Sequence, residues 1–525
     1  MAEETMQELV ARLHERREVF SKGGGQKAID KQHAAGKLTA RERLALLLDP
    51  DSFIETGLLG NHHSNHPDLK DRITPADGVV TGYGTIEGRM VCVAAYDFTV
   101  MAGSMGATGE YKVGQLRATA LEKRLPIIWL LDSAGARIQE STGSQFAGSG
   151  SLFKEQVLMS GVIPQVAAVM GPCAAGTAYI PGLADFVPMV KGIGSMALGG
   201  PHLVKAATGE DIGVEELGGT KIHCEISGVG DLEATDDAAC IAAIKDYLSF
   251  FPLNNQEQPP RRLTQDSPDR RDESLYKVVP INQRRAYDMH KVIAKIVDDG
   301  HFFEIKAGWA KNLITGLARI NGYPIGIVAN NPIVLGGTLD VNTADKGARF
   351  INLCDAFNIP LLFLCDTPGF IIGSQVEKQG IIRHGAKMIY AVSEATVPKF
   401  TVVVRKGYGA GYYAMCGKGY DPDYITAWPG AEISVMGPEG AVNIIGRRVL
   451  NEALEKGGPE AMNALREKML NDFRKVIDPY LAASYGYVDD IIDPADTRHA
   501  IAKALELTKN KQVKRVWKKH GVVPV

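Results

Sequence analysis

The sequence has 525 residues, of which 45% are hydrophobic and 23% charged, and its formal net charge is −3. This composition is that of a soluble globular protein, and the length exceeds what one hydrophobic core supports, so we expect two to four domains. The small net charge excludes a strongly basic nucleic-acid-binding protein. No uncharged apolar run reaches about 18 residues, so no membrane span is expected.

The chain begins with a charged segment, residues 1–20, that is predicted to be helical and is unlike a signal peptide, so we expect a cytoplasmic protein. Short apolar runs then alternate with helical patterns, which predicts βαβ units with largely parallel strands buried on both faces. Strands are predicted at VCVAAY (91–96), IIWLLD (127–132), IGIVAN (325–330) and LLFLCD (361–366), and helices at KGARFINLCDAFN (346–358) and AMNALREKMLNDFRKVI (461–477).

The chain contains a long internal repeat. LPIIWLLDSAGARI begins at Leu125 and IPLLFLCDTPGFII begins at Ile359, an offset of 234 in the numbering. IPQVAAVMGPCAAGTAY begins at Ile163, and VPKFTVVVRKGYGAGYY begins at Val397, which is the same offset. A third match, MALGGP with ISVMGP, ends at Pro201 and Pro438, an offset of 237. We therefore predict two duplicated halves, joined by the polar, proline-bearing segment 254–278.

Each half contains a turn of very small residues directly after an apolar strand, PCAAGTAY (172–179) and GYGAGYY (407–413). At a strand-to-helix junction the first N–H groups of the helix lack intrahelical partners, and small side chains let an outside atom approach them. Such a turn can form an oxyanion site from backbone alone. Tight packing of helix against strand also requires small residues, but two turns at equivalent places of a repeat favour a functional site.

These motifs resemble the carboxyltransferase β subunits of biotin-dependent acyl-CoA carboxylases, in the propionyl-CoA and methylcrotonyl-CoA carboxylase group. The resemblance implies an α/β fold of two tandem crotonase-like domains related by internal duplication. The N-terminal domain, 1–262, is expected on the acyl-CoA side and the C-terminal domain, 268–525, on the biotin side. Further segments that carry the resemblance are GKLTARERLALLLDPDSFIE (36–55), ADGVVTGYGTIEGR (76–89), DSAGARIQE (132–140), LGGPHLVKAATGEDIGVEELGG (198–219), KGARFINLCDAFNIPLLFLCDTPGF (346–370) and QGIIRHGAKMIYA (379–391).

The family moves a carboxyl group from carboxybiotin on a carrier protein to the α carbon, or the vinylogous γ carbon, of an acyl-CoA. The biotin nitrogen is the base, and the protein holds the enolate in two backbone oxyanion holes. By position, the resemblance assigns the thioester carbonyl to the amides of Ala175 and Gly176 and the biotin carbonyl to those of Ala410 and Gly411. It also places Tyr413, with Ala414 next to it, beside the acyl group. Gly135 and Arg137 are candidate substrate contacts because they follow an apolar strand, at the C-terminal end where α/β folds bind ligands.

The resemblance also implies partners for the chain. These are a biotin carboxylase subunit, a separate biotin carrier protein or subunit, and further copies of the chain in a hexamer, a trimer of dimers with the site shared between chains. Coenzyme A enters as part of the substrate. The sequence has no biotinylation motif of the AMKM type, and we expect no metal in this chain and no nucleic-acid partner.

The acyl group stays open at this point. Propionyl-type relatives have Asp where this sequence has Tyr413, and many relatives have Gly-Gly where it has Ala175-Gly176. The residues around Tyr413 resemble those of methylcrotonyl-type enzymes, whereas SAGARIQE (133–140) resembles the propionyl type. Propionyl-CoA or a related short or branched acyl-CoA is expected.

Other functions fit parts of the same sequence. The carboxyltransferase (alpha) subunit of a biotin-dependent acyl-CoA decarboxylase shares the same motifs. A non-catalytic copy conflicts with two intact small turns, and a crotonase-type hydratase needs paired glutamates that neither turn carries. Segment 192–197 matches a dinucleotide-binding pattern, segment 61–68 holds three histidines, and Arg137 suits a structural ion pair as well as a ligand contact.

Overall fold

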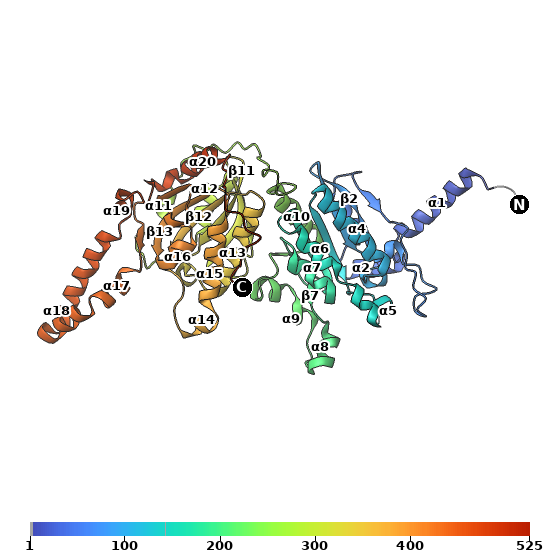
Figure 1. Cartoon of the computed structure of the whole chain (residues 1–525), viewed down its shortest axis with the longest axis horizontal. Helices are drawn as coiled ribbons and strands as arrows, with labels where there is room; N and C mark the ends of the chain where they lie inside the picture. The colour runs from blue at the N-terminus through green and yellow to red at the C-terminus, as the bar shows by residue number, and fades with distance from the viewer. Residues whose placement is uncertain (1–3, 142) are drawn as a thin grey trace. The chain divides into compact units, whose positions relative to one another are not determined.

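The protein folds into two compact units, Met1–Glu257 (unit 1) and Gln258–Val525 (unit 2), in a computed structural model that describes residues 4–141 and 143–525 (Figure 1). The sequence placed the division slightly later, between residues 262 and 268. Each unit consists of one sheet with helices packed against it.

Unit 1 contains an eight-stranded sheet in the order β1-β2-β3-β4-β5-β6-β8, with β7 paired to β5. β1 to β3 are antiparallel, and the remaining pairs are parallel. The strands are β1 (Ile54–Thr56), β2 (Val79–Ile86), β3 (Arg89–Tyr96), β4 (Ile127–Ser133), β5 (Gln165–Ala174), β6 (Pro188–Val190), β7 (Ser195–Ala197) and β8 (Leu232–Ala234). The helices are α1 (Met6–Ser21), α2 (Gln26–Ala34), α3 (Ala40–Leu47), α4 (Ala107–Lys123), α5 (Ile138–Ser141), α6 (Ser151–Met159), α7 (Tyr179–Leu183), α8 (Pro201–Thr208), α9 (Val214–Gly218) and α10 (Asp237–Ser249).

Unit 2 repeats this arrangement, with the order β16-β14-β13-β12-β11-β10-β9 and β15 paired to β13. Its strands are β9 (Phe302–Ile305), β10 (Leu313–Ile320), β11 (Tyr323–Asn330), β12 (Leu361–Thr367), β13 (Lys399–Tyr408), β14 (Tyr424–Ala427), β15 (Glu432–Ser434) and β16 (Asp490–Ile491). Its helices are α11 (Leu275–Val278), α12 (His290–Ile296), α13 (Val341–Ala356), α14 (Ser374–Lys378), α15 (Ile381–Glu394), α16 (Gly409–Ala414), α17 (Pro438–Ile445), α18 (Arg447–Val476), α19 (Pro479–Ser484) and α20 (Thr497–Thr508).

The predicted strands form the centre of each sheet. Every residue of β4 and of β12 is buried, as expected for parallel strands covered on both faces by helices. The predicted helix at 346–358 is α13, but it begins earlier, because the Asp340 side chain caps it by accepting a hydrogen bond from the N–H of Thr343 at 2.8 Å. The predicted helix at 461–477 is the second half of α18.

The internal duplication is confirmed at the level of single residues. The offset that separates Leu125 from Ile359, here called the repeat offset, also separates the starts of β2, β3, α4, β4 and β5 from those of β10, β11, α13, β12 and β13. Even an isolated bridge recurs at the repeat offset, since Met105 pairs with Ala136 and Leu339 with Phe370. Sequence similarity between the halves is confined to short motifs, so the equivalence of the folds rests on spacing and backbone conformation.

The α17–α18 hairpin distinguishes unit 2 from unit 1. α18 bends at Gly458 (φ 72°) and Pro459, and in Figure 1 it extends away from the sheet of its unit. The hairpin has a small apolar cluster of its own around Val442, Leu450 and Leu470. In unit 1 the corresponding element is the short helix α8, none of whose residues is buried.

A charged histidine ties α12 to β9. Nδ1 of His290 lies 2.6 Å from a carboxylate oxygen of Asp288, and Nε2 lies 2.9 Å from one of Glu304. Both ring nitrogens must donate, which requires the imidazolium form. These hydrogen bonds, that with Glu304 most of all, raise the pKa of His290 to about 9.

The raised pKa of His290 predicts a pH-dependent contribution to stability. The contribution of His290 to the free energy of unfolding is complete below the pKa of about 6.5 that histidine has in the unfolded chain. It is lost as the pH rises through the folded pKa of about 9. We expect the melting temperature of the wild type to fall more between pH 6.5 and 9.5 than that of a His290→Gln variant. Parallel profiles for the two proteins would contradict the assignment, and His499→Gln, which removes a single exposed contact with Asp269, is the matched control.

Candidate active site

The first small-residue turn follows β5. Ala175 opens a short 3₁₀ turn, Ala175–Ala178, in the left-handed region with φ 54°. The Thr177 hydroxyl closes the turn by donating to the carbonyl oxygen of Ala174 at 2.7 Å. A Cβ atom on Gly176 would have only the ends of the Met105 and Phe153 side chains near it, at 3.9 and 4.0 Å. The space beside Gly176 on its Cβ side is therefore open except for these two side-chain ends.

The second small-residue turn follows β13 and opens with the same left-handed backbone conformation. Gly409 opens α16 with φ 56°, and it lies at the repeat offset from Ala175. The repeat therefore pairs Ala175 and Gly176 with Gly409 and Ala410, one residue earlier than the predicted Ala410 and Gly411. The constant repeat offset, which is visible in the sequence, already indicates that Gly409 is the counterpart of Ala175.

Gly411 has a packing role in this turn. It is buried, and a Cβ atom at this position would lie 2.7 Å from the Cα of Gly369. The backbone of the neighbouring turn thus requires a glycine here. Ala414 is also buried, whereas the Tyr413 side chain is 51% exposed beside the turn.

Glycines also bring the end of the neighbouring strand against each turn. Gly135 follows β4 with φ 96°, and a Cβ atom there would lie 2.8 Å from the carbonyl oxygen of Ala174. Gly369, its counterpart at the repeat offset, has φ 117° and faces the carbonyl oxygen of Tyr408 in the same way, at 3.5 Å. Gly135 therefore supports the first turn through backbone contact.

Arg137 is fully engaged inside unit 1. Its guanidinium donates to Asp77 Oδ1 at 2.5 Å and Glu140 Oε1 at 2.8 Å, and also to Ser104 Oγ and to the carbonyl oxygens of Ser104 and Asp77. These contacts use all five guanidinium N–H groups, and the residue is 1% exposed. Arg137 thus ties together the segments around the first turn, and a ligand would reach it only by displacing one of these partners.

The left-handed conformation of Ala175 predicts a stabilising substitution. A residue with a Cβ atom in this region destabilises the folded state by about 1–2 kcal/mol relative to glycine. Glycine also has more conformational freedom in the unfolded chain, which offsets part of this difference. We expect Ala175→Gly to raise the free energy of unfolding by about 1 kcal/mol, read as a higher melting temperature. Ala178→Gly, at φ −66°, is the matched control and should lower it; a lower value for Ala175→Gly would contradict the argument.

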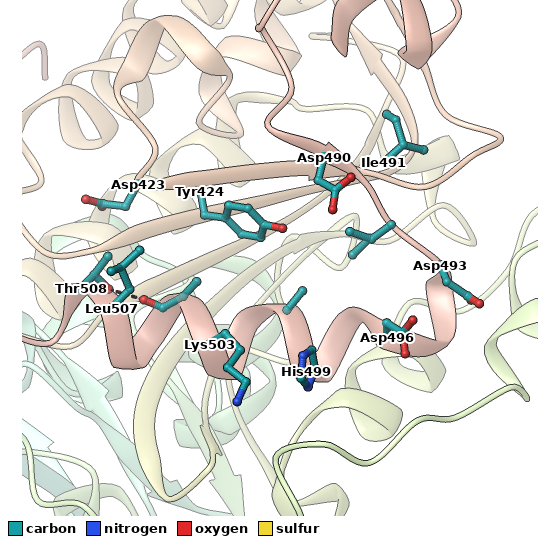
Figure 2. A pocket seen from close by; sticks show the side chains of 13 residues that line it. Asp423, Tyr424, Asp490, Ile491, Asp493, Asp496, His499, Lys503, Leu507 and Thr508 are labelled. Carbon is teal, nitrogen blue, oxygen red and sulfur yellow. Dashed lines mark hydrogen bonds between the residues drawn. The ribbon is translucent and has the colours of Figure 1, made fainter.

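Figure 2 shows a groove of about 540 Å³ along α20 of unit 2, and its lining contains no residue of the second turn. Tyr424, which lines it, pairs in register with Phe400 near the start of β13, whereas the second turn follows the end of that strand. Several acidic side chains of the groove already have cationic partners, since Asp423 contacts Lys511 and both Asp493 and Asp496 contact Arg271. The groove is therefore not the oxyanion site.

Two alternative motifs lack the structure that their functions need. Segment 192–197 leads into strand β7 instead of a helix, so the dinucleotide-binding interpretation is wrong. In segment 61–68, Nε2 of His62 lies 2.8 Å from the carbonyl oxygen of Arg72. Across residues 4–141 and 143–525, no three His, Cys, Asp or Glu side chains are grouped so that they could hold a metal ion. In the same part of the chain, none of the helices has the length and apolar character needed to cross a membrane.

Comparison with known proteins identifies the class to which this fold and its paired turns belong. Residues 31–523 match the Carboxyl transferase domain family. The chain is 49% identical to the methylmalonyl-CoA carboxyltransferase 12S subunit of Propionibacterium freudenreichii subsp. shermanii, over 99% of this chain and 98% of that protein. It is 46% identical to methylmalonyl-CoA decarboxylase subunit alpha of Veillonella parvula and 44% identical to a propionyl-CoA carboxylase beta chain of Roseobacter denitrificans, in each case over 99% of this chain and 100% of the other.

A solved structure agrees with these relatives. A transcarboxylase 12S structure, with methylmalonyl-coenzyme A and methylmalonic acid bound, superposes with a TM-score of 0.95 at 47% identity, covering 100% of this chain and 99% of that chain. The two units therefore have the duplicated crotonase-like fold of carboxyltransferases. The chain belongs to the carboxyl transferase family, as a carboxyltransferase of the biotin-dependent acyl-CoA carboxylase class.

Proposed function

We propose that the chain exchanges a carboxyl group between a carrier-bound biotin and a short acyl-CoA, with propionyl-CoA and methylmalonyl-CoA as the pair. The observation that carries the proposal is the recurrence of a small-residue turn that opens with a left-handed residue, after equivalent strands of the two units. Residues 1–262 would bind the acyl-CoA and residues 268–525 the biotin. The named substrates of the relatives support this choice.

The backbone amides of the two turns would do the electrostatic work. Those of Ala175 and Gly176 are assigned to the thioester oxygen, which becomes an enolate oxygen, and those of Gly409 and Ala410 to the ureido oxygen of biotin. Donors fixed by the fold stabilise such developing charge without reorganisation. Biotin supplies the carboxyl group and the nitrogen that takes up the α-proton. The bond from carboxyl carbon to nitrogen is exchanged for one to the α carbon, and no redox partner is needed.

The proposed partners follow from this half-reaction. A biotin-bearing carrier domain must deliver the carboxyl group, and a biotin carboxylase must load it when the flux is toward carboxylation. Further copies of this chain in a hexamer are part of the proposal, because the solved relative forms a hexamer. We place the protein in the cytoplasm.

The proposal is tested by carboxyl transfer with defined substrates. The purified chain is incubated with methylmalonyl-CoA and free biotin, and propionyl-CoA is measured; biotinylated carrier domain then replaces free biotin. We expect formation of propionyl-CoA that depends on biotin and that avidin blocks. Product formation that is insensitive to avidin and independent of biotin would overturn the proposal.

A decarboxylase subunit is the second candidate, favoured by the 46% identical relative. Both candidates share the biotin half-reaction, so the transfer assay supports either. Addition of a biotin carboxylase, its biotinylated carrier, ATP and bicarbonate separates them. Sustained net carboxylation of propionyl-CoA supports the carboxylase. If the chain only removes the carboxyl group from methylmalonyl-CoA, the result supports the decarboxylase.

A further inference from the structure

Each small-residue turn is preceded by a bulge in the strand that leads to it. In β5, Val169 pairs with Leu131 and Cys173 pairs with Ser133, so residues 170–172 stand opposite the single residue Asp132. In β13, residues 404–406 stand opposite Asp366 in the same way. A bulge bends its strand and redirects the segment after it, which in both strands is an oxyanion turn. Both aspartates are 0% exposed.

In unit 1 the cations that neutralise Asp132 come from residues 32–43, which run from α2 into α3. Lys37 Nζ lies 2.7 Å and Arg43 Nη1 3.0 Å from the two carboxylate oxygens, and Gln32 Nε2 donates to the carboxylate at 2.9 Å. Arg43 Nη2 also donates to the carbonyl oxygen of Met170 at 2.7 Å, and therefore holds the bulge directly. Residues 32–43 are thus joined to the strand that carries the first turn.

In unit 2 the bulge carries its own two cations, Arg405 and Lys406. Arg405 Nε donates to Asp366 Oδ2 at 2.9 Å, and Lys406 Nζ lies 3.6 Å from Oδ1. At the position equivalent to Arg405, unit 1 has Gly171, where a Cβ atom would lie 1.9 Å from Asp132 Oδ1. The carboxylate of unit 1 thus occupies space that a side chain would need, so its cations must come from elsewhere.

We propose that Asp132 and Asp366 are positioning residues, each of which sets the geometry of one oxyanion turn through its bulge. The different origin of their cations makes the acyl-CoA turn dependent on residues 32–43, whereas the biotin turn depends on Arg405 and Lys406 within its own strand. The assignment of a substrate to each turn rests on the function proposed above. Misplacement of reacting groups by about 1 Å can cost on the order of 100-fold in rate, so a buried carboxylate behind each turn is expected to affect one substrate selectively.

The kinetic test compares Asp132→Asn with Asp366→Asn, which keep the shape of the side chain and remove its charge. Carboxyl transfer between methylmalonyl-CoA and free biotin is measured at varied concentrations of each. We expect kcat to fall in both variants, because transfer needs both turns. Asp132→Asn should raise the KM for methylmalonyl-CoA about tenfold or more and leave the KM for biotin within about twofold, and Asp366→Asn should do the reverse. Asp231→Asn and Asp298→Asn, buried aspartates outside the bulges, are the matched controls and should shift neither.

Hydrogen exchange of the backbone amides gives a readout that does not need activity. Asp132→Asn should speed exchange in 170–177 and leave 404–411 unchanged, and Asp366→Asn should show the opposite pattern. Lys37→Met, which removes one donor to Asp132 and keeps the carboxylate, is the milder variant and decides the question if Asp132→Asn does not fold; it should affect 170–177 alone.

Different outcomes separate the two proposals. A wild-type chain without carboxyl transfer overturns the proposed function, and the exchange patterns then still decide the role of the aspartates. If transfer occurs but both KM values move together in each variant, or exchange rises equally in both segments, the positioning role is wrong.

Discussion

Gly176→Val should reduce the turnover of carboxyl transfer by about 10²–10³-fold, the loss that follows removal of a single oxyanion donor. We expect the fold to tolerate the substitution, because a Cβ atom at this position meets only two side-chain ends at ordinary contact distance. The branched side chain would instead fill the open space beside Gly176 and, under the proposed function, obstruct the approach of the thioester oxygen to the backbone amides of the turn.

The controls for this variant separate folding from catalysis. Gly182→Ala places a methyl group where nothing lies within 4 Å, and it should keep full turnover. The melting temperatures of both variants should stay close to that of the wild type. A folded Gly176→Val protein with wild-type turnover would remove Ala175 and Gly176 from the mechanism.

By resemblance, Tyr413 lies beside the acyl group in an active site shared between two chains. Tyr413→Asp should therefore change the choice of acyl-CoA by about 10- to 200-fold in relative kcat/KM without abolishing turnover, because single pocket contacts discriminate by about 1–3 kcal/mol. The Tyr413 ring is half exposed beside the second turn, with its centroid 6.1 Å from that of Tyr412 and 6.0 Å from that of Tyr420. Its replacement removes ring surface and adds charge where propionyl-type relatives carry Asp, while the packing of the buried residues is left intact.

Competition among acetyl-, propionyl-, butyryl- and 3-methylcrotonyl-CoA measures this effect. Tyr413→Phe removes the hydroxyl and keeps the ring, so it separates hydrogen bonding from shape. If Tyr413→Asp and the wild type give the same ratios, position 413 does not select the acyl group, and Ala414 and Ala175 become the candidates for that role.

The sequence predicts the architecture well because duplication leaves a regular trace in it. Apolar strands followed by small turns recur at a fixed spacing, and burial of parallel strands on both faces makes those strands visible as continuous apolar runs. Strands were predicted at the positions of β3 and β11, but the antiparallel pairing of β1–β3 and of β9–β11 was not. Their strands lie outside the repeated motifs that first revealed the two halves.

The position of the second turn shows where residue type alone is insufficient. Gly409, Ala410 and Gly411 are all small, so composition does not say which of them corresponds to Ala175. Backbone conformation separates them, because Gly409 has the left-handed φ of Ala175 and Gly411 packs against the backbone of Gly369. The backbone dihedral angles decide which place a residue takes in a turn, and small residues permit several sets of these angles.

Long-range polar contacts were also beyond the sequence. Nothing in the local pattern around Lys37 or Arg43 indicates Asp132, which follows 95 and 89 residues later. Arg137 was as consistent with a ligand contact as with an ion pair, and only the arrangement of Asp77, Glu140 and Ser104 shows that its donors are occupied. Such partners are chosen by the tertiary fold, which brings distant segments together.

The constant spacing of the two halves also sets limits on how this chain can be rebuilt. From the start of β2 to the first residue of the turn, every strand and α4 keep the repeat offset from their counterparts. Beyond the turn the offset widens slightly, with Pro188 of β6 against Tyr424 of β14 and Ser195 of β7 against Glu432 of β15. Residues 79–175 and 313–409 are therefore equal in length, and a chimera that swaps them leaves the length of each unit unchanged. Insertions belong after the turn, where the α17–α18 hairpin shows that extra chain is accommodated outside the sheet.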